Sequence, residues 1–308
     1  MLKKRVGAFI CCAMLLMAIP CAEAVMPREI VPLDYDSLVT RQGQHHYLFA
    51  CVDTWQGSAG NLGNTDGIIL VTMDVRANRL IFTTFTREML VMKPDGGIGR
   101  MTYLAKNYGP DALARVIGTH FGVKVSKYII FSMDNVQQII DVMGGVYITV
   151  TDAEAAYLNR YRISRTSTTP SMDRGGTYLF SGHAAVIYMR IRKVGNDGDS
   201  GRTRRMRTVM ATLAHKFSDI TLSQSMDILG SVSENLVITN MTMMDFVDAL
   251  GYAMQLRGVT PEGLQMPPDG AMEPIVYAGM QTRQVDFIKS REVLHAFLDT
   301  MSFEVMDD

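Results

Sequence analysis

The order of its apolar segments is the feature that most restricts the fold of this chain. Short apolar runs rich in β-type residues come first, and segments whose apolar residues recur every three or four positions follow. The first runs predict three strands, the last two of which form a hairpin: Tyr47–Val52, Ile68–Met73 and Leu80–Phe85. The pattern then predicts a helix through Leu113–Phe121, a strand at Tyr128–Phe131, a helix through Val136–Met143 that ends at Gly144-Gly145, and a strand at Val146–Val150. Strands that alternate with helices predict an α/β fold, in which a mixed sheet is flanked by helices in a single layered domain.

The second half of the chain contains no segment with the composition of an interdomain linker. Residues 157–177 are polar and rich in Arg, Ser and Thr, which is typical of a surface loop. The remaining predicted elements are helices at 181–190 and 201–217, separated by Gly195–Asp199, a helix that begins at the capping box Thr242–Asp245, and a last helix near Lys289–Met301. The chain has 308 residues, 47% of them hydrophobic, and can therefore bury one sizeable core. We expect one domain over residues 47–303, preceded by an N-terminal segment, residues 25–46.

Residues 1–24 have the three parts of a secretory signal peptide. Lys3–Arg5 is basic, Val6–Pro20 is apolar, and Ala22–Ala24 places small residues where a peptidase would cleave. The apolar run is shorter than the roughly 20 residues that span a bilayer, and an uncleaved signal anchor is the alternative. Either form predicts export to the outer face of the cytoplasmic membrane, as a secreted or membrane-associated protein of the cell envelope.

The cysteines agree with export. Cys11, Cys12 and Cys21 lie in the predicted leader, so Cys51 is the one cysteine of the mature chain and no internal disulfide can form. Because Cys51 lies within an apolar run, we expect a buried core thiol rather than a nucleophile.

Composition and motifs exclude several classes of function. The net charge of −1 offers no basic surplus to nucleic acid, so we expect no nucleic-acid partner. The chain has no Walker A loop, no HExxH, CxxC or GxSxG motif, and its six histidines lack metal-ligand spacing. No helix directly follows the glycines at Gly57, Gly60 and Gly63, which favours a plain loop over a phosphate cradle.

The predicted helix 201–217 carries an arginine on its apolar side. At 100° per residue, Arg202 falls about 40° from Met206, inside the apolar stripe, whereas Arg204 points to the opposite side. A guanidinium on the core-facing side is unfavourable unless an anion meets it. We place Arg202 in the first turn of the helix, where the helix dipole also disfavours a cation.

Other arginines strengthen the expectation of a bound anion. Arg190 and Arg192 flank Ile191 and would project to one side of an extended chain, and Arg87 follows a predicted strand. A salt bridge to an acid such as Asp197 explains any one of these arginines. Taken together they favour a bound di- or polyphosphate, because the planar guanidinium suits phosphate oxygens.

Two carboxylates lie at predicted strand ends. Asp53 ends the first strand, and Asp66 begins the second after the glycine-containing loop. Such acids are often caps or turn formers, but the loop can return the chain to the same edge of the sheet. Since Mg²⁺ typically takes one or two carboxylates together with phosphate oxygens, the pair is a candidate Mg²⁺ site.

The chain resembles the LytR–CpsA–Psr (LCP) family of cell-envelope phosphotransferases over essentially its whole mature length. The matching segments keep the order and spacing of the family: Val52-Asp53-Thr54, Asn64-Thr65-Asp66, Thr84–Glu88, Asp141–Val146, Tyr188–Arg192 and Asp199–Arg205. The resemblance implies an α/β fold with an apolar tunnel for a polyprenyl chain and the pyrophosphate at the mouth of the tunnel. It also implies that Asp53 and Asp66 bind Mg²⁺. Arg87, Arg190, Arg192 and Arg202, with Arg205 beside them, would then bind the pyrophosphate and act in catalysis.

The implied reaction transfers a glycopolymer phosphate, such as teichoic acid or capsule, from a polyprenyl-pyrophosphate carrier to peptidoglycan. Such phosphoryl transfer depends on positioning and on charge neutralisation. Two alternatives stay open, a hydrolase of the lipid pyrophosphate and a non-catalytic lipid-binding envelope sensor or attenuator. The chain departs from the family pattern at Asn64, Thr86, Glu88 and Met206, where the family usually has Arg, Pro, Asp and Gln.

Overall fold

The computed structural model describes residues 27–38, 40–53, 62–160, 172–195, 198–219 and 238–300. The predicted leader, residues 1–24, lies outside the described residues, as do Gly57, Gly60 and most of the predicted loop at 157–177. The elements in chain order are β1 (Gln44–Val52), β2 (Thr65–Asp74), β3 (Arg79–Phe85), β4 (Leu90–Met92), β5 (Ile98–Arg100), η1 (Met101–Tyr103), α2 (Leu104–Tyr108), α3 (Pro110–Phe121), β6 (Lys127–Ser132), α4 (Met133–Val142), β7 (Val146–Val150), α5 (Asp152–Arg160), β8 (Gly176–Phe180), α6 (Gly182–Met189), α7 (Gly198–Asp219), β9 (Ile238–Thr239), α9 (Met243–Gln255), β10 (Glu262–Met266), β11 (Met272–Tyr277), β12 (Met280–Val285) and α10 (Phe287–Asp299).

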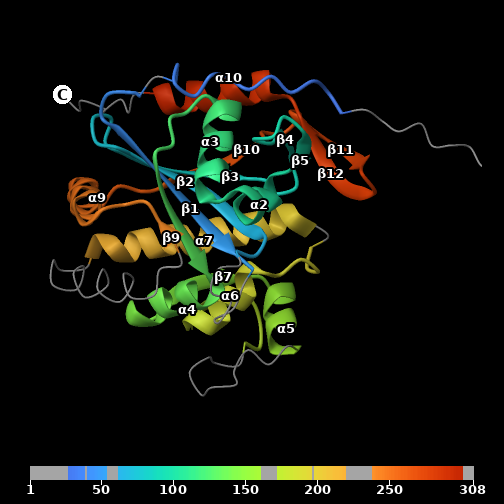
Figure 1. The fold of residues 1–308 in the computed structure, drawn as a ribbon. Helices are drawn as coiled ribbons and strands as arrows, with labels where there is room; N and C mark the ends of the chain where they lie inside the picture. The colour runs from blue at the N-terminus through green and yellow to red at the C-terminus, as the bar shows by residue number, and fades with distance from the viewer. Residues whose placement is uncertain are drawn as a thin grey trace, which may run out of the picture.

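The main sheet is mixed and has six strands in the order β10-β3-β2-β1-β6-β9. β2 pairs antiparallel with both β1 and β3, which confirms the predicted hairpin. β6 lies parallel to β1, and β10 lies parallel to β3. In Figure 1, α3 and α10 lie above the strands of this sheet and α7 lies below them. The predicted mixed α/β architecture is therefore confirmed.

The two faces of the main sheet differ in how completely they are covered. On the first face Leu48, Ala50 and Val52 of β1 are fully buried, in one cluster with side chains of α3 and α10. On the second face the apolar side chains meet α7 and α9 instead, and many of them stay half-buried. We call this side the second apolar face; its half-buried side chains are Phe49, Met73, Leu80 and Phe131 of the sheet, Met206 and Met210 of α7, and Phe246 of α9.

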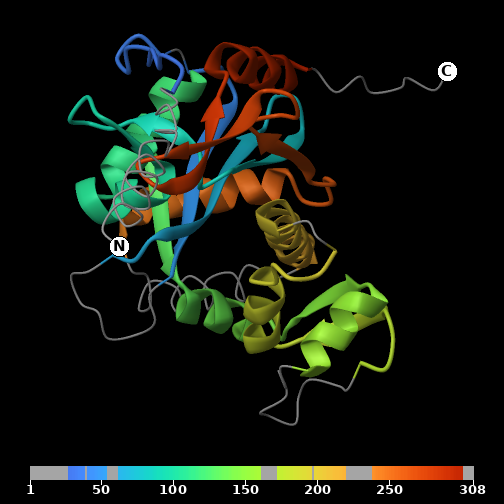
Figure 2. The ribbon, with the colours of Figure 1, turned by 90° about the vertical axis from the view of Figure 1, so that its right-hand side faces the viewer.

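A smaller group of elements packs beside the main sheet around a second core. The β7–β8 pair lies apart from the main sheet and contacts α4, α5, α6 and α7 through residues such as Val146, Leu158, Phe180 and Val209. Figure 2 shows this group, in green to yellow, below the main sheet. Asp141 near the end of α4 accepts the Gly182 backbone N–H at 2.7 Å and so joins α4 to the start of α6.

The sequence predictions are wrong at two places. The polar stretch at 157–177 is not all loop, because α5 continues to Arg160 and β8 begins at Gly176. Thr151 and Glu154 cap the start of α5 by exchanging backbone and side-chain hydrogen bonds, which accounts for a helix in so polar a segment. α7 begins at Gly198, so Arg202 lies in its second turn and not in the first.

Candidate functional site

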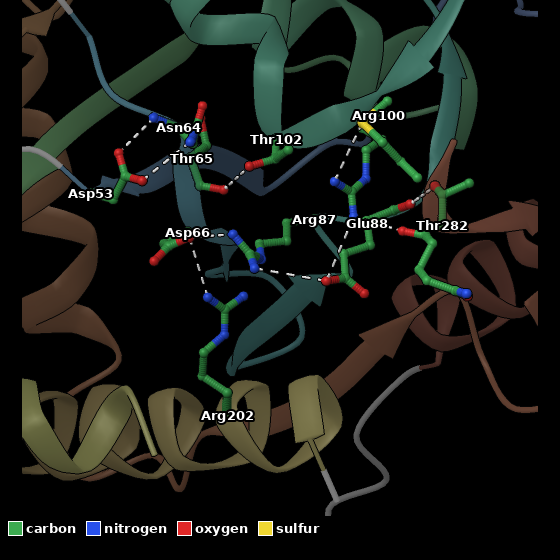
Figure 3. Close-up of polar contacts among 12 residues, drawn as sticks. Asp53, Asn64, Thr65, Asp66, Arg87, Glu88, Arg100, Thr102, Arg202 and Thr282 are labelled. Carbon is green, nitrogen blue, oxygen red and sulfur yellow. Dashed lines mark hydrogen bonds and ion pairs between the residues drawn. The ribbon is translucent and has the colours of Figure 1, made fainter. Parts of the chain in front are cut away.

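The end of β1 and the beginning of β2 lie side by side next to Asp53. Its backbone N–H donates to the Asn64 carbonyl oxygen at 3.0 Å, so the two chain segments run side by side here. The Asn64 backbone N–H donates to Asp53 Oδ1 at 2.7 Å, and Asn64 Nδ2 donates to Oδ2 at 3.2 Å (Figure 3). Asn64 therefore orients the Asp53 carboxylate with neutral donors.

A β-bulge sets the direction of Asp66. Cys51 pairs with Gly67 and Val52 pairs with Thr65, so the pairing of β1 with β2 skips Asp66. Regular alternation would turn Asp66 to the same side as Ile68 and Leu70, which are fully buried on the first face. A bulge breaks this alternation and re-aims a side chain. Asp66 instead faces α7.

Asp66 joins two arginines that come from distant parts of the chain. Arg87 NH1 contacts Asp66 Oδ1 at 2.5 Å, and Arg202 NH1 contacts the same oxygen at 3.3 Å (Figure 3). The side chains of Arg87, Asp66 and Arg202 are only 15%, 11% and 5% exposed, so water screens their charges weakly. Asp66 Oδ1 thus brings two guanidinium groups to one point from different elements.

Gly67 faces the Met206 side chain of α7. A β-carbon at Gly67 would lie 2.4 Å from Met206 Sδ and 3.0 Å from its Cε, so glycine leaves room for the flexible end of this side chain between β2 and α7. Arg202 stands one turn before Met206 and is 4% exposed, whereas Arg204 is exposed to solvent. The predicted helical phase, with Arg202 inward and Arg204 outward, is confirmed.

Glu88 and Arg100 extend this line of charges, and the sequence did not single out Arg100. Glu88 Oε1 lies 3.7 Å from Arg87 NH2 and 3.9 Å from Arg100 NH2 (Figure 3). Arg100 NH2 also donates to the Gln281 carbonyl oxygen at 2.7 Å, and the Thr282 hydroxyl donates to the Glu88 carbonyl oxygen. The β11–β12 hairpin therefore supports this end of the site. Arg100 is the last residue of the short strand β5, whose three residues carry no periodic signal in the sequence.

The pKa of the Cys51 thiol is shifted by the charged side chains around it. Its pKa is raised to about 12, chiefly by burial; Asp66 and Asp53 also raise the pKa, whereas Arg190 and Arg202 lower it. The thiol therefore stays protonated at neutral pH, and Cys51 is partly buried against the second core rather than fully buried within it. Arg190 is therefore one of the charged groups that shift the pKa of this thiol, together with Asp53, Asp66 and Arg202.

The remaining predicted arginines differ from one another in exposure. Arg190 and Arg192 are both exposed, Arg190 at the end of α6 and Arg192 on the segment after it. Arg205 is 1% exposed and donates from Nε to Glu154 Oε1 at 2.6 Å and from NH1 to the Ile191 carbonyl oxygen at 3.0 Å. These contacts hold α7 to α5 and to the segment that carries Arg192.

The oxygen donors at this end of the sheet are compatible with Mg²⁺. Among the described residues no group of three or more His, Cys, Asp or Glu side chains is arranged to hold a metal ion. Mg²⁺ needs fewer protein ligands, since it commonly takes one or two carboxylates plus phosphate oxygens and water. The ion pairs of Asp66 with Arg87 and Arg202 both involve its Oδ1 atom. Beside Asp53, the buried Oδ1 atom of Asn64 has no hydrogen-bond partner among the described residues. Asp53 and Asp66, with Asn64 nearby, therefore fit a hard divalent cation.

Several known proteins are similar to this chain in sequence or in fold. "Polyisoprenyl-teichoic acid–peptidoglycan teichoic acid transferase TagU" of Oceanobacillus iheyensis is 29% identical over 225 residues, which cover 68% of this chain and 67% of that protein. "Biofilm regulatory protein A" of Streptococcus mutans is 27% identical over 207 residues, 64% of this chain and 50% of that protein. The chain thus spans one half to two thirds of the length of these two relatives. The structure of TagT with bound octaprenyl pyrophosphate lipid matches with a TM-score of 0.63 at 16% identity, over 89% of this chain and 95% of that chain.

The family itself follows from a longer match. The sequence profile of the LytR_cpsA_psr family matches residues 29–292, a span that includes every residue of the site described above. The chain therefore belongs to the LytR_cpsA_psr family.

Proposed function

We propose that this chain is an extracytoplasmic phosphotransferase that moves a glycopolymer phosphate from a polyprenyl-pyrophosphate carrier to peptidoglycan. The observation that carries the proposal is the shared carboxylate of Asp66, which holds Arg87 and Arg202 together at the end of a half-buried apolar face. A charged group beside a long apolar surface suits a ligand with a pyrophosphate head and a hydrocarbon tail. Transferase activity on teichoic acid is what the name of the TagU relative states.

The arginines would bind and orient the pyrophosphate. Arg87 and Arg202 converge on one point because Asp66 holds both, so little reorganisation is needed when phosphate oxygens arrive. Arg190, and in our proposal Arg192, would add positive charge from the segment after α6. In the transfer, the acceptor hydroxyl oxygen forms a bond to the glycopolymer phosphorus, the bond from that phosphorus to the carrier's bridging oxygen breaks, and polyprenyl phosphate leaves. The hydroxyl proton must pass to a base, and Asp53, Asp66 and Glu88 are the carboxylates described around this site.

Mg²⁺ is part of this proposal. Asp53 and Asp66 would hold it, and when bound it would neutralise the charge of the pyrophosphate oxygens. Asn64 would keep the Asp53 carboxylate in place through its two hydrogen bonds.

The second apolar face would receive the hydrocarbon chain. Along α7, Met206 and Met210 follow Arg202 at intervals of one turn, and they pack near Ile69, Val71 and Phe82 of the sheet. The apolar tunnel that the family resemblance implies stays a prediction for this chain, and this face is where we place it. Activity on such a lipid locates the protein at the outer face of the cytoplasmic membrane. Within the described part of the chain, no helix is long and apolar enough to cross a bilayer.

Two of the arginines of α7 test the proposal. Purified protein is given a polyprenyl-pyrophosphate-linked saccharide and peptidoglycan fragments with Mg²⁺, and release of polyprenyl phosphate and the transferred product are followed by mass spectrometry. Arg202→Ala should reduce turnover at least 100-fold, because one buried charge-assisted contact contributes about 3 kcal/mol in such sites. Arg204→Ala, at the exposed position two residues later, is the matched control and should keep the activity.

Other outcomes select between the remaining functions. Release of polyprenyl phosphate without any transferred product would favour the lipid-pyrophosphate hydrolase. Binding of the lipid without release would favour the non-catalytic sensor or attenuator. A folded protein that neither binds nor turns over the lipid would contradict the proposal altogether.

A further inference from the structure

α9 is apolar over a much wider arc than its contact with the sheet requires. At 100° per residue, its apolar residues from Ala249 through Phe246 and Met243 to Met244 cover about 220° of the helix circumference. A helix that covers one core face needs an apolar stripe of roughly 100°. None of the residues of α9 is fully buried. The surplus apolar arc therefore faces outward.

The outward part of this arc forms a stripe of large side chains. We call it the outer stripe of α9; it consists of Met243, Met244, Val247 and Met254, which are 70%, 68%, 47% and 54% exposed. The opposite side of the helix packs on the main sheet, where Phe246 and Ala249 join Tyr47, Phe49 and Phe131. One helix thus borders the second apolar face on its inner side and presents the outer stripe on the other.

α9 and the charged site lie at opposite ends of β1. Tyr252 of α9 stacks on His45, near the beginning of the strand, with ring centroids 3.7 Å apart. Asp53 follows the end of the same strand, so the nine residues of β1, about 30 Å of extended chain, separate the two. A lipid bound with its head group at Asp66 and its tail along the second apolar face would therefore point its tail toward α9.

Charges on α9 indicate what kind of surface the stripe contacts. The helix carries Asp245 and Asp248 but no Lys or Arg, and Asp245 pairs with Lys127 at 2.8 Å. Attraction to anionic head groups therefore contributes little, and the contact has to be apolar. Flexible methionine side chains adapt well to an irregular apolar surface such as acyl chains.

We propose that the outer stripe of α9 docks onto the acyl region of the outer leaflet of the membrane, where a polyprenyl chain passes beneath α9 onto the second apolar face. The inference rests on the proposed function, because that function supplies a substrate whose tail starts in the bilayer. Docking leaves α9 between the bilayer and the sheet, with Phe246 toward the protein and Met243 toward the lipid.

Photolabelling from within the bilayer tests the docking. The full-length chain is reconstituted into phosphatidylcholine vesicles that contain a phosphatidylcholine with a diazirine on its acyl chain, and the labelled residues are located by mass spectrometry. Val276 and Ile288, which are 55% and 66% exposed, are matched apolar controls on other elements. Labelling of Met243, Met244, Val247 and Met254 should exceed labelling of Val276 and Ile288 at least tenfold, with little change between low and high salt.

Serine substitutions make the test independent of the intrinsic reactivity of each side chain. The combined variant Met243→Ser, Met244→Ser, Val247→Ser and Met254→Ser should lose at least nine tenths of the labelling of α9, whereas Val276→Ser with Ile288→Ser should keep it. Circular dichroism checks the fold, and the single variant Met243→Ser, expected to lower the labelling of α9 at least twofold, replaces the combined variant if that variant unfolds. Equal labelling of Val276 and Ile288, or no labelling of α9, would overturn the docking.

Two further measurements separate the remaining outcomes. If sedimentation shows a dimer that the four serine substitutions dissociate, the stripe is a contact between two copies and the proposal is wrong. Turnover of the lipid pyrophosphate in detergent is measured in parallel. Turnover without labelling of α9 would overturn the docking alone, whereas labelling of α9 without turnover would overturn the proposed function alone.

Discussion

Replacing Arg205 with methionine separates a structural role for this arginine from a role in substrate binding. The family pattern placed Arg205 with the pyrophosphate ligands, but its Nε donates to Glu154 Oε1 at 2.6 Å. NH1 and NH2 donate to the carbonyl oxygens of Ile191 and Val194, at 3.0 and 3.5 Å. Arg205 is 1% exposed and Glu154 is 6% exposed, so the pair is shielded from water. We expect Arg205→Met to act on stability.

The magnitude follows from the charge that is left behind. Methionine fills most of the volume of the arginine stem, but it leaves Glu154 buried without its cation and two carbonyl oxygens without these donors. Removing one partner of a buried ion pair typically lowers the free energy of unfolding by about 3–5 kcal/mol. For a domain of this size 1 kcal/mol corresponds to roughly 2–4 °C, so the midpoint of thermal unfolding should fall by about 10 °C.

Urea unfolding at pH 7 and differential scanning calorimetry measure this loss. Adding Glu154→Gln to the Arg205→Met background removes the uncompensated charge and should restore about half of the lost stability or more. Lipid-pyrophosphate binding by the folded fraction should be close to that of the unmodified protein. A variant that unfolds at the original temperature and no longer binds the lipid would refute this reasoning and return Arg205 to the ligand set.

Three further predictions test the packing and the titration of the core. Gly182→Ala should destabilise the protein by about 3 kcal/mol in urea unfolding, since its β-carbon would lie 2.0 Å from the Gln137 carbonyl oxygen; a stable variant would contradict this packing. Gly67→Val should displace the end of the Met206 side chain and weaken lipid-pyrophosphate binding, and Met206→Ala should relieve the clash and restore binding; unchanged binding in the single variant would show that this contact does not position Arg202. Burial lowers the pKa of His120 to about 4, so the unfolded chain binds a proton between pH 6.5 and 4 that the folded chain excludes. Stability should therefore fall by about 3 kcal/mol as the pH drops through this range, and His120→Gln should flatten the dependence; an unchanged pH slope in that variant would count against it.

The elements that the sequence predicted well are those with a regular pattern of apolar side chains. β1, β2, β3 and β6 are continuous apolar runs because both faces of the sheet are apolar, and α3 and α4 show a clear helical period. The direction of each side chain of α7 could be predicted for the same reason. An apolar stripe that repeats over four turns of the helix fixes the directions in which Arg202 and Arg204 point. By contrast, β10 reads Glu-Gly-Leu-Gln-Met and is a strand through its pairing with β3, which no local pattern encodes.

The partners of the charged residues could not be predicted because they depend on long-range contacts. Glu154 lies 51 positions before Arg205, and the sequence offers many other carboxylates at similar distances. Asp66 turns toward α7 because the pairing of β1 and β2 contains a bulge, and register is a property of the folded sheet rather than of either strand. The sequence pointed to Asp66, Arg87 and Arg202, which the fold brings together, whereas the pairing of Arg205 with Glu154 emerges only from the fold.

α7 borders both the proposed head-group site and the proposed site of the hydrocarbon tail. Its position relative to the sheet should therefore affect the binding of both parts of the ligand. It runs along β2 from the charged end, where Arg202 meets Asp66, to the region where Met210 and Ala211 pack near Val71 and Phe82. A shift of the helix away from Gly67 would therefore loosen the arginine pair and widen the apolar layer at the same time. Head-group binding and tail binding should accordingly fail together in variants that displace α7, whereas Arg202→Ala should weaken only the binding of the head group. Comparing the affinity for polyprenyl pyrophosphate with that for inorganic pyrophosphate in both kinds of variant would reveal this coupling, and equal losses for the two ligands in a displaced-helix variant would argue against it.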